Sequence, residues 1–200
     1  MPRDRDVDAF DRRASSYDTG RIGRLHHDIA DRTIQLAITC APGARRVLDV
    51  GCGSGYLVRQ LSQRLPGAVE LAGIDAAPRM VEAARALAPP DGRSHLTVGV
   101  VESLPYPAGS FDLVVSTTSF DHWADQRAGL EECARVLVPG GHLVLTDLFS
   151  ALLLPTLVAG HRGRARTTAR AGRLLTAAGF RSLRWHRIYT LLLKAVTATT

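Results

Sequence analysis

Short apolar runs alternate with amphipathic stretches along the first 150 residues of the chain. Residues 22–39 carry apolar side chains at helical spacing and predict a helix that Pro42 and Gly43 end. Runs rich in apolar and β-branched residues predict strands at 45–50, 69–75, 95–100, 111–117 and 142–148. Helices are predicted between these strands, up to about Leu65, at 79–88 and at 125–137.

The predicted strands are apolar on both faces. The runs VLDV (47–50) and LVVS (113–116) lack the alternation of a half-exposed strand, so they predict a parallel sheet covered by helices on both sides. A turn is predicted at 138–141, before the fifth strand. Further on, the pattern predicts a loop or short helix at 151–160, a basic helix at 165–179 and extended stretches at 180–188 and 189–198. The chain shows no repeats and no linker, which predicts one α/β domain of the doubly wound type.

Charge is unevenly distributed along the chain. The net charge is +6, yet the 50 residues after position 150 hold nine basic and no acidic residues, which leaves residues 1–150 at −3. An arginine-rich segment can bind phosphates or nucleic acid, but such a run is more often a solvated helix face. We interpret it as a solvated face and keep a polyanion site as the alternative.

The location of the protein is predicted from three weak signals. No apolar run reaches the roughly 20 residues that span a bilayer. The first residues are too charged for a secretory signal. Cys40, Cys52 and Cys133 show neither disulfide nor metal-ligand spacing, which favours a reducing compartment. We therefore expect a cytoplasmic protein without a membrane segment or a metal site.

Three glycines on alternate positions follow the first predicted strand, in VLDVGCGSGYL (47–57). Glycine lets the backbone approach a ligand at the end of a parallel strand, where helix N–H groups also point. A dinucleotide fingerprint would need its third glycine at position 56, where this chain has tyrosine. Asp49 precedes the loop and suits a cationic ammonium group, whereas Asp75 ends the second strand and can accept hydrogen bonds from a ribose. An S-adenosylmethionine (SAM) molecule carries all these parts.

Four motifs resemble those of class I SAM-dependent methyltransferases, of the type that acts on small molecules. They are VLDVGCGSGYL, GIDAAPRMVEAAR, VESLPYPAGSFDLVVS and LEECARVLVPGGHLVLTD, in family order across residues 47–147. The N-terminal FDRRASSYD is similar to a lead-in found in such enzymes. The resemblance implies a Rossmann-like, doubly wound, mostly parallel seven-stranded sheet with an antiparallel final strand, and SAM as cofactor.

The resemblance also implies the cofactor-binding residues. Asp49 is expected at the methionine amino end, Asp75 at the ribose, and Tyr17 over the cofactor. The other expected positions are Gly51, Gly53 and Gly55 with Cys52 as a small filler in the loop, Ala76 and Met80 beside the adenine, Val101 and Glu102 at the adenine edge, and Ser116 and Thr117 beside the methionine. The chain departs from the family at Val100, where an aspartate often holds the adenine amino group.

Candidates for proton transfer follow the fourth predicted strand, in SFDHW. His122, with Asp121 beside it, could act as general base, or could merely pack against the next helix. His26 and His27, on the helix before the first strand, could line the acceptor pocket. Asp147, at the end of the fifth strand, is a further candidate, with a structural role at the edge of the sheet as the alternative. The aromatic-flanked proline motif of amino-methylating DNA enzymes is absent after this strand, which favours a small-molecule acceptor with its methylated atom (O, N or C) left open.

Two alternative functions remain open in the sequence. One is an RNA methyltransferase that uses the arginine-rich tail, and the other is a SAM-fold protein that binds ligand without transferring a methyl group. In either case we expect a single domain with an N-terminal helical cap at 1–45, a SAM-binding core at 46–150, and a C-terminal helix and last strands at 151–200.

Overall fold

This computed structural model describes residues 5–65, 70–149, 167–189 and 192–200. The helices are α1 (Arg5–Arg13), η1 (Ala14–Ser16), α2 (Gly20–Cys40), α3 (Tyr56–Arg64), α4 (Pro78–Leu87), η2 (Val101–Ser103), η3 (Phe120–His122), α5 (Gln126–Val136) and α7 (Thr168–Ala177), with η for short 3-10 helices. The strands are β1 (Arg46–Val50), β2 (Glu70–Asp75), β3 (Ser94–Val98), β4 (Phe111–Thr117), β5 (Leu137–Leu148), β6 (Arg181–Arg187) and β7 (Leu193–Thr199). The loop or helix predicted at 151–160 lies outside these described residues.

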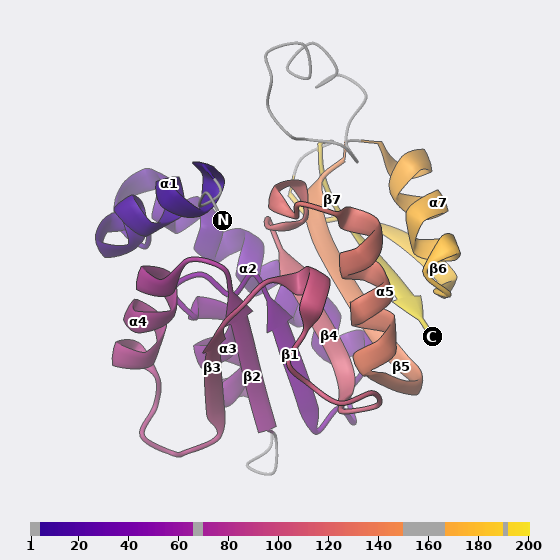
Figure 1. Ribbon diagram of the computed structural model, residues 1–200, viewed down its shortest axis with the longest axis horizontal. Helices are drawn as coiled ribbons and strands as arrows, with labels where there is room; N and C mark the ends of the chain where they lie inside the picture. Colours follow the sequence, from indigo (N-terminus) through magenta and orange to yellow (C-terminus); the bar gives the residue numbers. More distant parts are fainter. Residues whose placement is uncertain (1–4, 66–69, 150–166, 190–191) are drawn as a thin grey trace.

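All seven strands form one sheet in the order β3-β2-β1-β4-β5-β7-β6 (Figure 1). The first five strands run parallel, β7 runs antiparallel to β5, and β6 runs antiparallel to β7. The mostly parallel seven-stranded sheet with an antiparallel final strand is therefore confirmed. The strand order reverses at β1, since chain tracing leads outward to β3 and then back to β4, and such a reversal opens a crevice at the carboxyl ends of the strands.

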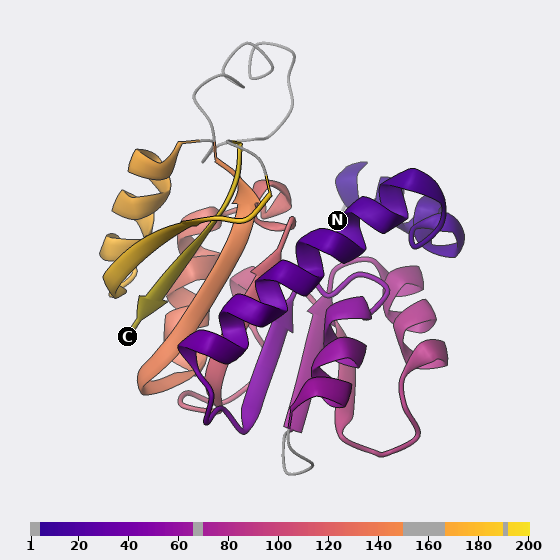
Figure 2. The same ribbon diagram turned by 180° about the vertical axis from the view of Figure 1, so that it is seen from behind.

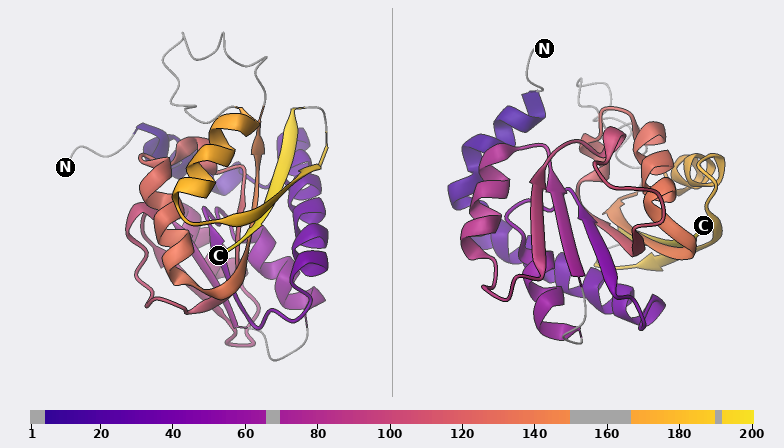
Figure 3. Two further views of the ribbon diagram at one scale, coloured as in Figure 1. Left: turned by 90° about the vertical axis from the view of Figure 1, so that its right-hand side faces the viewer. Right: turned by 60° about the horizontal axis from the view of Figure 1, so that its bottom comes forward.

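Helices cover both faces of the sheet, as the continuous apolar runs predicted. Successive strand residues point to opposite faces, so Val47 packs in the layer of α2, α3 and α4 while Leu48 packs in the layer of α5 and α7. Figure 2 shows α2 and α3 across one face, and the side view in Figure 3 separates α2 from α5 and α7. In the described part of the chain, no helix is long and apolar enough to cross a membrane.

Local sequence signals explain the starts of two helices, α4 and α5. Pro78 begins α4, where its missing N–H needs no partner. Asp125 caps α5 by accepting hydrogen bonds from the backbone N–H groups of Arg127 and Ala128. The predicted turn at 138–141 is wrong as a boundary, because β5 already begins at Leu137 and runs through these residues.

The reason for this difference is a register shift in the sheet. Leu137 pairs with Phe111 on β4, and regular pairing resumes only with Leu113 opposite His142. Gly140, with a φ of 77°, lies in the intervening segment. The chain thus bends within β5, as a strand does at a β-bulge. A local turn signal in the sequence cannot distinguish a turn before a strand from a bulge within it.

Candidate functional site

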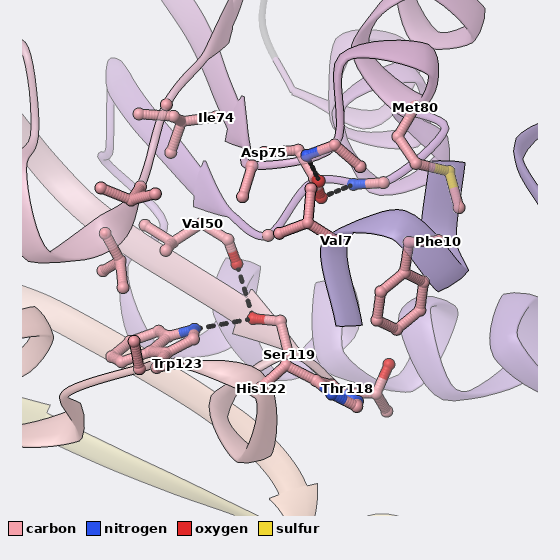
Figure 4. A pocket seen from close by; sticks show the side chains of 18 of the residues that line it. Val7, Phe10, Val50, Ile74, Asp75, Met80, Thr118, Ser119, His122 and Trp123 are labelled. Atoms are coloured by element: carbon pink, nitrogen blue, oxygen red, sulfur yellow. Dashed lines mark hydrogen bonds between the residues drawn. The ribbon is translucent and has the colours of Figure 1, made fainter. Parts of the chain in front are cut away.

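A cavity of about 160 Å³ lies at the carboxyl ends of β1, β2 and β4. Its wall comes from α1, the glycine loop after β1, the start of α4, and the loops after β3 and β4. Figure 4 shows Phe10 and Met80 on one side of this cavity and Ser119 and Trp123 on the other. The residues predicted from sequence that line it are Tyr17, Gly51, Gly53, Asp75, Ala76, Met80, Val101, Glu102, Thr117 and His122.

The three loop glycines serve different purposes. All have positive φ, at 74° for Gly51, 51° for Gly53 and 76° for Gly55, a region that residues with a side chain avoid. A Cβ on Gly51 would overlap the Ser119 side chain, and one on Gly55 would lie 2.9 Å from the Ala84 Cβ. A Cβ on Gly53 would meet only the Tyr17 ring, at 3.9 Å. Gly53 therefore leaves bare backbone toward the cavity, whereas the other two allow close packing within the protein.

Asp75 links the end of β2 to the glycine loop. Its Oδ2 accepts a hydrogen bond from the Gly53 N–H and its Oδ1 accepts one from the Ala77 N–H, both at 2.9 Å. Burial raises the pKa of this carboxyl, and the two N–H donors oppose that rise. Because each carboxylate oxygen can accept a second hydrogen bond, Asp75 can still bind two hydroxyl groups of a ligand.

Thr117 supplies an unpaired polar atom to the same cavity. Its Oγ1 is buried and has no hydrogen-bond partner among the described residues, although buried hydroxyls are nearly always paired. The neighbouring Ser119 is instead fully used, since its Oγ donates to the Val50 carbonyl at 3.0 Å and accepts from the Trp123 Nε1 at 3.2 Å. A bound polar ligand would satisfy Thr117, so the residues present fit the cofactor that the sequence motifs imply.

Two aspartates of the segment FDRRASSYD, neither of them predicted as a site residue, join the N-terminal cap to the site. Asp11 accepts a hydrogen bond from the Arg79 N–H at 2.9 Å, at the start of α4. Asp18 accepts one from the Ser54 Oγ at 2.9 Å, inside the glycine loop. These contacts bring Tyr17 over Asp75, and burial together with that carboxylate raises the pKa of the Tyr17 phenol to about 12. The segment FDRRASSYD (10–18) was therefore the available sequence signal for the wall residue Phe10, whereas Val7 lies before it and had none.

Four predicted cofactor residues lie outside the cavity wall: Asp49, Cys52, Gly55 and Ser116. Asp49 is 3% exposed, and burial together with the nearby Asp75 raises the pKa of its carboxyl to about 8. Burial also raises the pKa of the Cys52 thiol, which keeps it protonated and unreactive. Asp49 is thus a buried carboxyl behind the loop, and its raised pKa keeps it protonated at neutral pH.

The pKa of Asp49 predicts how stability depends on pH. The unfolded chain releases this proton near 3.8 and the folded chain keeps it up to about 8, so the stability present below the lower value is lost as pH rises to the upper one. One such carboxyl lowers the free energy of unfolding by about 1 kcal/mol per pH unit. Urea titrations across this window should show a shallower slope for Asp49→Asn than for the unsubstituted protein, and equal slopes would contradict the assignment.

A second cavity, of about 520 Å³, adjoins the first and shares Phe10, Tyr17, Thr118 and His122 with it. The three residues predicted as proton-transfer candidates, Asp121, His122 and Asp147, all line it. Of the two histidines expected in the acceptor pocket, His26 lines this cavity. His27 points elsewhere: its ring stacks on Tyr56 at 3.8 Å and its Nε2 is 3.2 Å from the Asp18 Oδ1. His122 stands at the junction of the two cavities, edge-on to the Phe10 ring at 4.9 Å.

Known proteins match this chain in sequence. A family model described as a methyltransferase domain matches residues 48–145. A demethylmenaquinone methyltransferase from Deinococcus radiodurans is 40% identical over 139 residues, which cover 67% of this chain and 56% of that protein. A malonyl-acyl-carrier-protein O-methyltransferase from Halorhodospira halophila is 35% identical over 133 residues, 66% of this chain and 44% of that protein. The chain spans about half the length of these curated relatives.

A solved structure matches over the whole described fold. It is a chain from the complex between the Trm112 methyltransferase activator of Haloferax volcanii and a methyltransferase, with a TM-score of 0.81 at 21% identity. The match covers 100% of this chain and 99% of the other. At this level of identity the likeness shows the fold alone, and it agrees with the strand order given above.

Proposed function

Because this chain belongs to the class I SAM-dependent methyltransferases, we propose that it transfers a methyl group from SAM to a small-molecule acceptor. The observation that carries this proposal is the cavity at the ends of β1, β2 and β4, where Gly53, Asp75 and the unpaired Thr117 hydroxyl meet. When bound there, SAM supplies an electrophilic methyl group on a positively charged sulfur. The Asp75 carboxylate, which holds the loop through the Gly53 N–H, favours a cationic ligand.

Each part of the cofactor has a proposed partner in this cavity. Asp75 accepts hydrogen bonds from the ribose hydroxyls, and the Gly53 backbone lies against the methionine end beside Thr117. Ala76 and Met80 flank the adenine. With Val100 in place of the usual aspartate, the adenine edge meets Val101 and Glu102, whose Oε1 already accepts a hydrogen bond from the Asp125 N–H at 3.0 Å.

The acceptor is proposed to occupy the second cavity, with His122 between it and the cofactor. A base at this junction can remove a proton from the acceptor as the methyl group is transferred. Asp121, next to it in η3, lines the same cavity and would steady the charge that His122 gains. The main work of the protein is then to align the two reactants.

We further propose that residues 1–200 act as one cytoplasmic domain, with a cap at 1–45, a cofactor-binding core at 46–150 and a C-terminal part at 151–200. The fit of the cap onto the glycine loop through Asp18 supports this arrangement. The described cysteines are all free thiols, which agrees with a reducing compartment.

Calorimetry with SAM and with NADH tests the cofactor proposal. We expect SAM to bind and NADH to give no measurable heat, because the Asp75 carboxylate lies against the loop where a pyrophosphate would have to lie. Incubation with methyl-labelled SAM and a panel of small hydroxyl, amine and carbon acids then identifies acceptors. Binding of NADH in preference to SAM would contradict the proposal.

The role of His122 can be measured once the panel yields a turned-over acceptor. His122→Gln is expected to lower kcat about a hundredfold, since general base catalysis contributes on that order, while the Kd for SAM changes by less than about threefold. The exposed His95 of β3 lies outside both cavities, so His95→Gln is the matched control. If His122→Gln and His95→Gln had the same kcat, His122 would have only a packing role.

A further inference from the structure

Several exposed apolar side chains line the second cavity. Among the described residues, seven large hydrophobic side chains are exposed, and four of them line this cavity: Ile22, Leu25, Leu148 and Tyr189. Ile22 is 69% exposed and Leu25 is 41% exposed. A contiguous exposed apolar surface in a concave site usually marks a ligand. Its continuity with the cofactor cavity indicates that this ligand is the methyl acceptor.

The apolar wall continues inward from the surface to the core. On α2, Ile22 and Leu25 are followed one turn later by Ile29, which is buried against Leu193 of β7. These positions form one helical stripe. The wall can therefore bury a ring or chain along its length, and it offers few hydrogen-bond partners there.

Polar groups gather at the inner end of the cavity, around Asp147 at the end of β5. Asp147 is only 3% exposed. Its Oδ1 accepts a hydrogen bond from the Leu148 N–H at 2.7 Å, and its Oδ2 accepts one from the Asp121 N–H at 3.3 Å. Each oxygen retains the capacity to accept one more hydrogen bond, so the carboxyl can receive a hydroxyl group of a ligand.

The charge of this inner end changes close to neutral pH. Burial, together with the Asp121 carboxylate, raises the pKa of Asp147 to about 7, against the opposing effect of two N–H donors and His122. Burial, reinforced by His27, lowers the pKa of His26, so His26 is neutral at neutral pH. The other charged and titratable groups facing this space are Arg13, Tyr17 and Tyr189, with Lys194 opposite Asp147 across the β5–β7 ladder.

We propose that the second cavity takes a neutral, largely apolar molecule bearing one dissociable hydroxyl group, and that Asp147 binds this hydroxyl. This inference rests on the methyl-transfer function proposed above. The hydroxyl oxygen forms the new bond to the methyl carbon, the carbon–sulfur bond breaks with its electron pair going to sulfur, and the hydroxyl proton passes to His122, the base proposed above. The positive charge of the sulfonium is thereby replaced by that of the protonated imidazole. Asp147 accepts a hydrogen bond from the hydroxyl group and, with Asp121, stabilises the charge that His122 gains.

The alternative class of ligand is an acidic one, such as a carboxylate or a phosphate. Asp121 and Asp147 together disfavour it, because two carboxyl groups line the inner end where the reacting group must lie. Arg13 is the one arginine that lines this cavity among the described residues, and it is exposed. Ligand selection by charge is therefore a direct test of the proposal.

The test uses calorimetry with two probes of the same ring system, 2-naphthol and 2-naphthoate, in the presence of saturating S-adenosylhomocysteine. We expect 2-naphthol to bind about tenfold more tightly than 2-naphthoate, and its affinity to rise about fivefold as pH increases through 7. Asp147→Asn should bring the two affinities within about threefold of each other and abolish the pH dependence. Preferred binding of 2-naphthoate, or a pH response that survives in Asp147→Asn, would overturn the proposal.

Two leucine variants examine the apolar wall. Leu25→Glu introduces a carboxylate into the wall and should weaken 2-naphthol binding about tenfold. Leu87→Glu changes an exposed leucine on α4, which is 53% exposed and lines neither cavity, and should leave 2-naphthol binding unchanged. Unchanged binding in Leu25→Glu would overturn the placement of the ligand. Binding of S-adenosylhomocysteine by each variant checks that the variant is folded. If the unsubstituted protein itself did not bind S-adenosylhomocysteine, that result would contradict the proposed function and not this inference.

Discussion

Replacement of Asp75 by alanine is expected to weaken SAM binding about a hundredfold. The variant loses a buried carboxylate that can accept hydrogen bonds from two ribose hydroxyls, and hydrogen bonds to a charged group contribute about 1.5–3 kcal/mol each. It also releases the Gly53 and Ala77 N–H groups, which Asp75 holds at 2.9 Å. The glycine loop then loses its link to β2. Calorimetry with SAM measures the change in Kd directly.

A matched control is present at the opposite end of the same sheet. Asp112, in β4, also accepts hydrogen bonds from two backbone N–H groups, those of Arg45 and Arg46, each at 2.9 Å. Asp112→Ala should cost stability through the same kind of loss but leave the Kd for SAM unchanged, since Asp112 lines neither cavity. If both variants weakened SAM binding equally, the effect would be a general loss of structure and the ribose assignment would be wrong.

The second large effect is expected within the glycine loop, where alanine at Gly51 should lower stability and alanine at Gly53 should lower SAM affinity. Gly51→Ala places a Cβ onto the Ser119 side chain at a positive φ, so overpacking and backbone strain together should lower the free energy of unfolding by about 3 kcal/mol. Gly53→Ala has space around it and should lose only about 1 kcal/mol from strain. Its Cβ instead occupies the surface that the ligand needs, so the affinity for SAM should fall about tenfold or more.

Gly92→Ala separates strain from packing in this series. Gly92 has a φ of 71°, close to that of Gly51, and nothing lies within 4 Å of an added Cβ. The variant should therefore lose about 1 kcal/mol of stability and retain full SAM affinity. Urea unfolding and calorimetry on the three variants measure both quantities. Normal stability in Gly51→Ala would contradict the close approach of Ser119, and normal affinity in Gly53→Ala would contradict the cofactor position.

The fold was predictable because its determinants are local. A run such as VLDV is apolar on both faces, and only a strand covered by two helical layers buries all of it. Helix starts were similarly readable from Pro78 and from the Asp125 cap. The strand register around residues 137–142 was not readable, because a bulge depends on which residues of β4 lie opposite.

The residues of the cavity wall were predicted only in part. Those near the strand ends, such as Gly53, Asp75 and Thr117, lie on the cavity wall because parallel strands bring their carboxyl ends to one edge. Ser119 was missed, although its hydroxyl joins Val50 to Trp123. A single serine in a loop belongs to no recognisable sequence pattern. The Ser119 side chain can pack against the glycine loop only because Gly51 has no Cβ.

The sequence by itself determined the layered sheet, the glycine loop and the acids at the ends of two strands, because spacing along the chain decides these features. Tertiary structure alone decided which carboxyls are buried, that Asp147 and His26 face a shared space, and that the N-terminal cap covers both cavities. The physical reason is that desolvation and cavity shape depend on segments far apart in the chain that meet only after folding. The pKa of Asp147 depends on that burial and on the Asp121 carboxylate. Neither effect can be predicted from the residues next to Asp147 in the sequence.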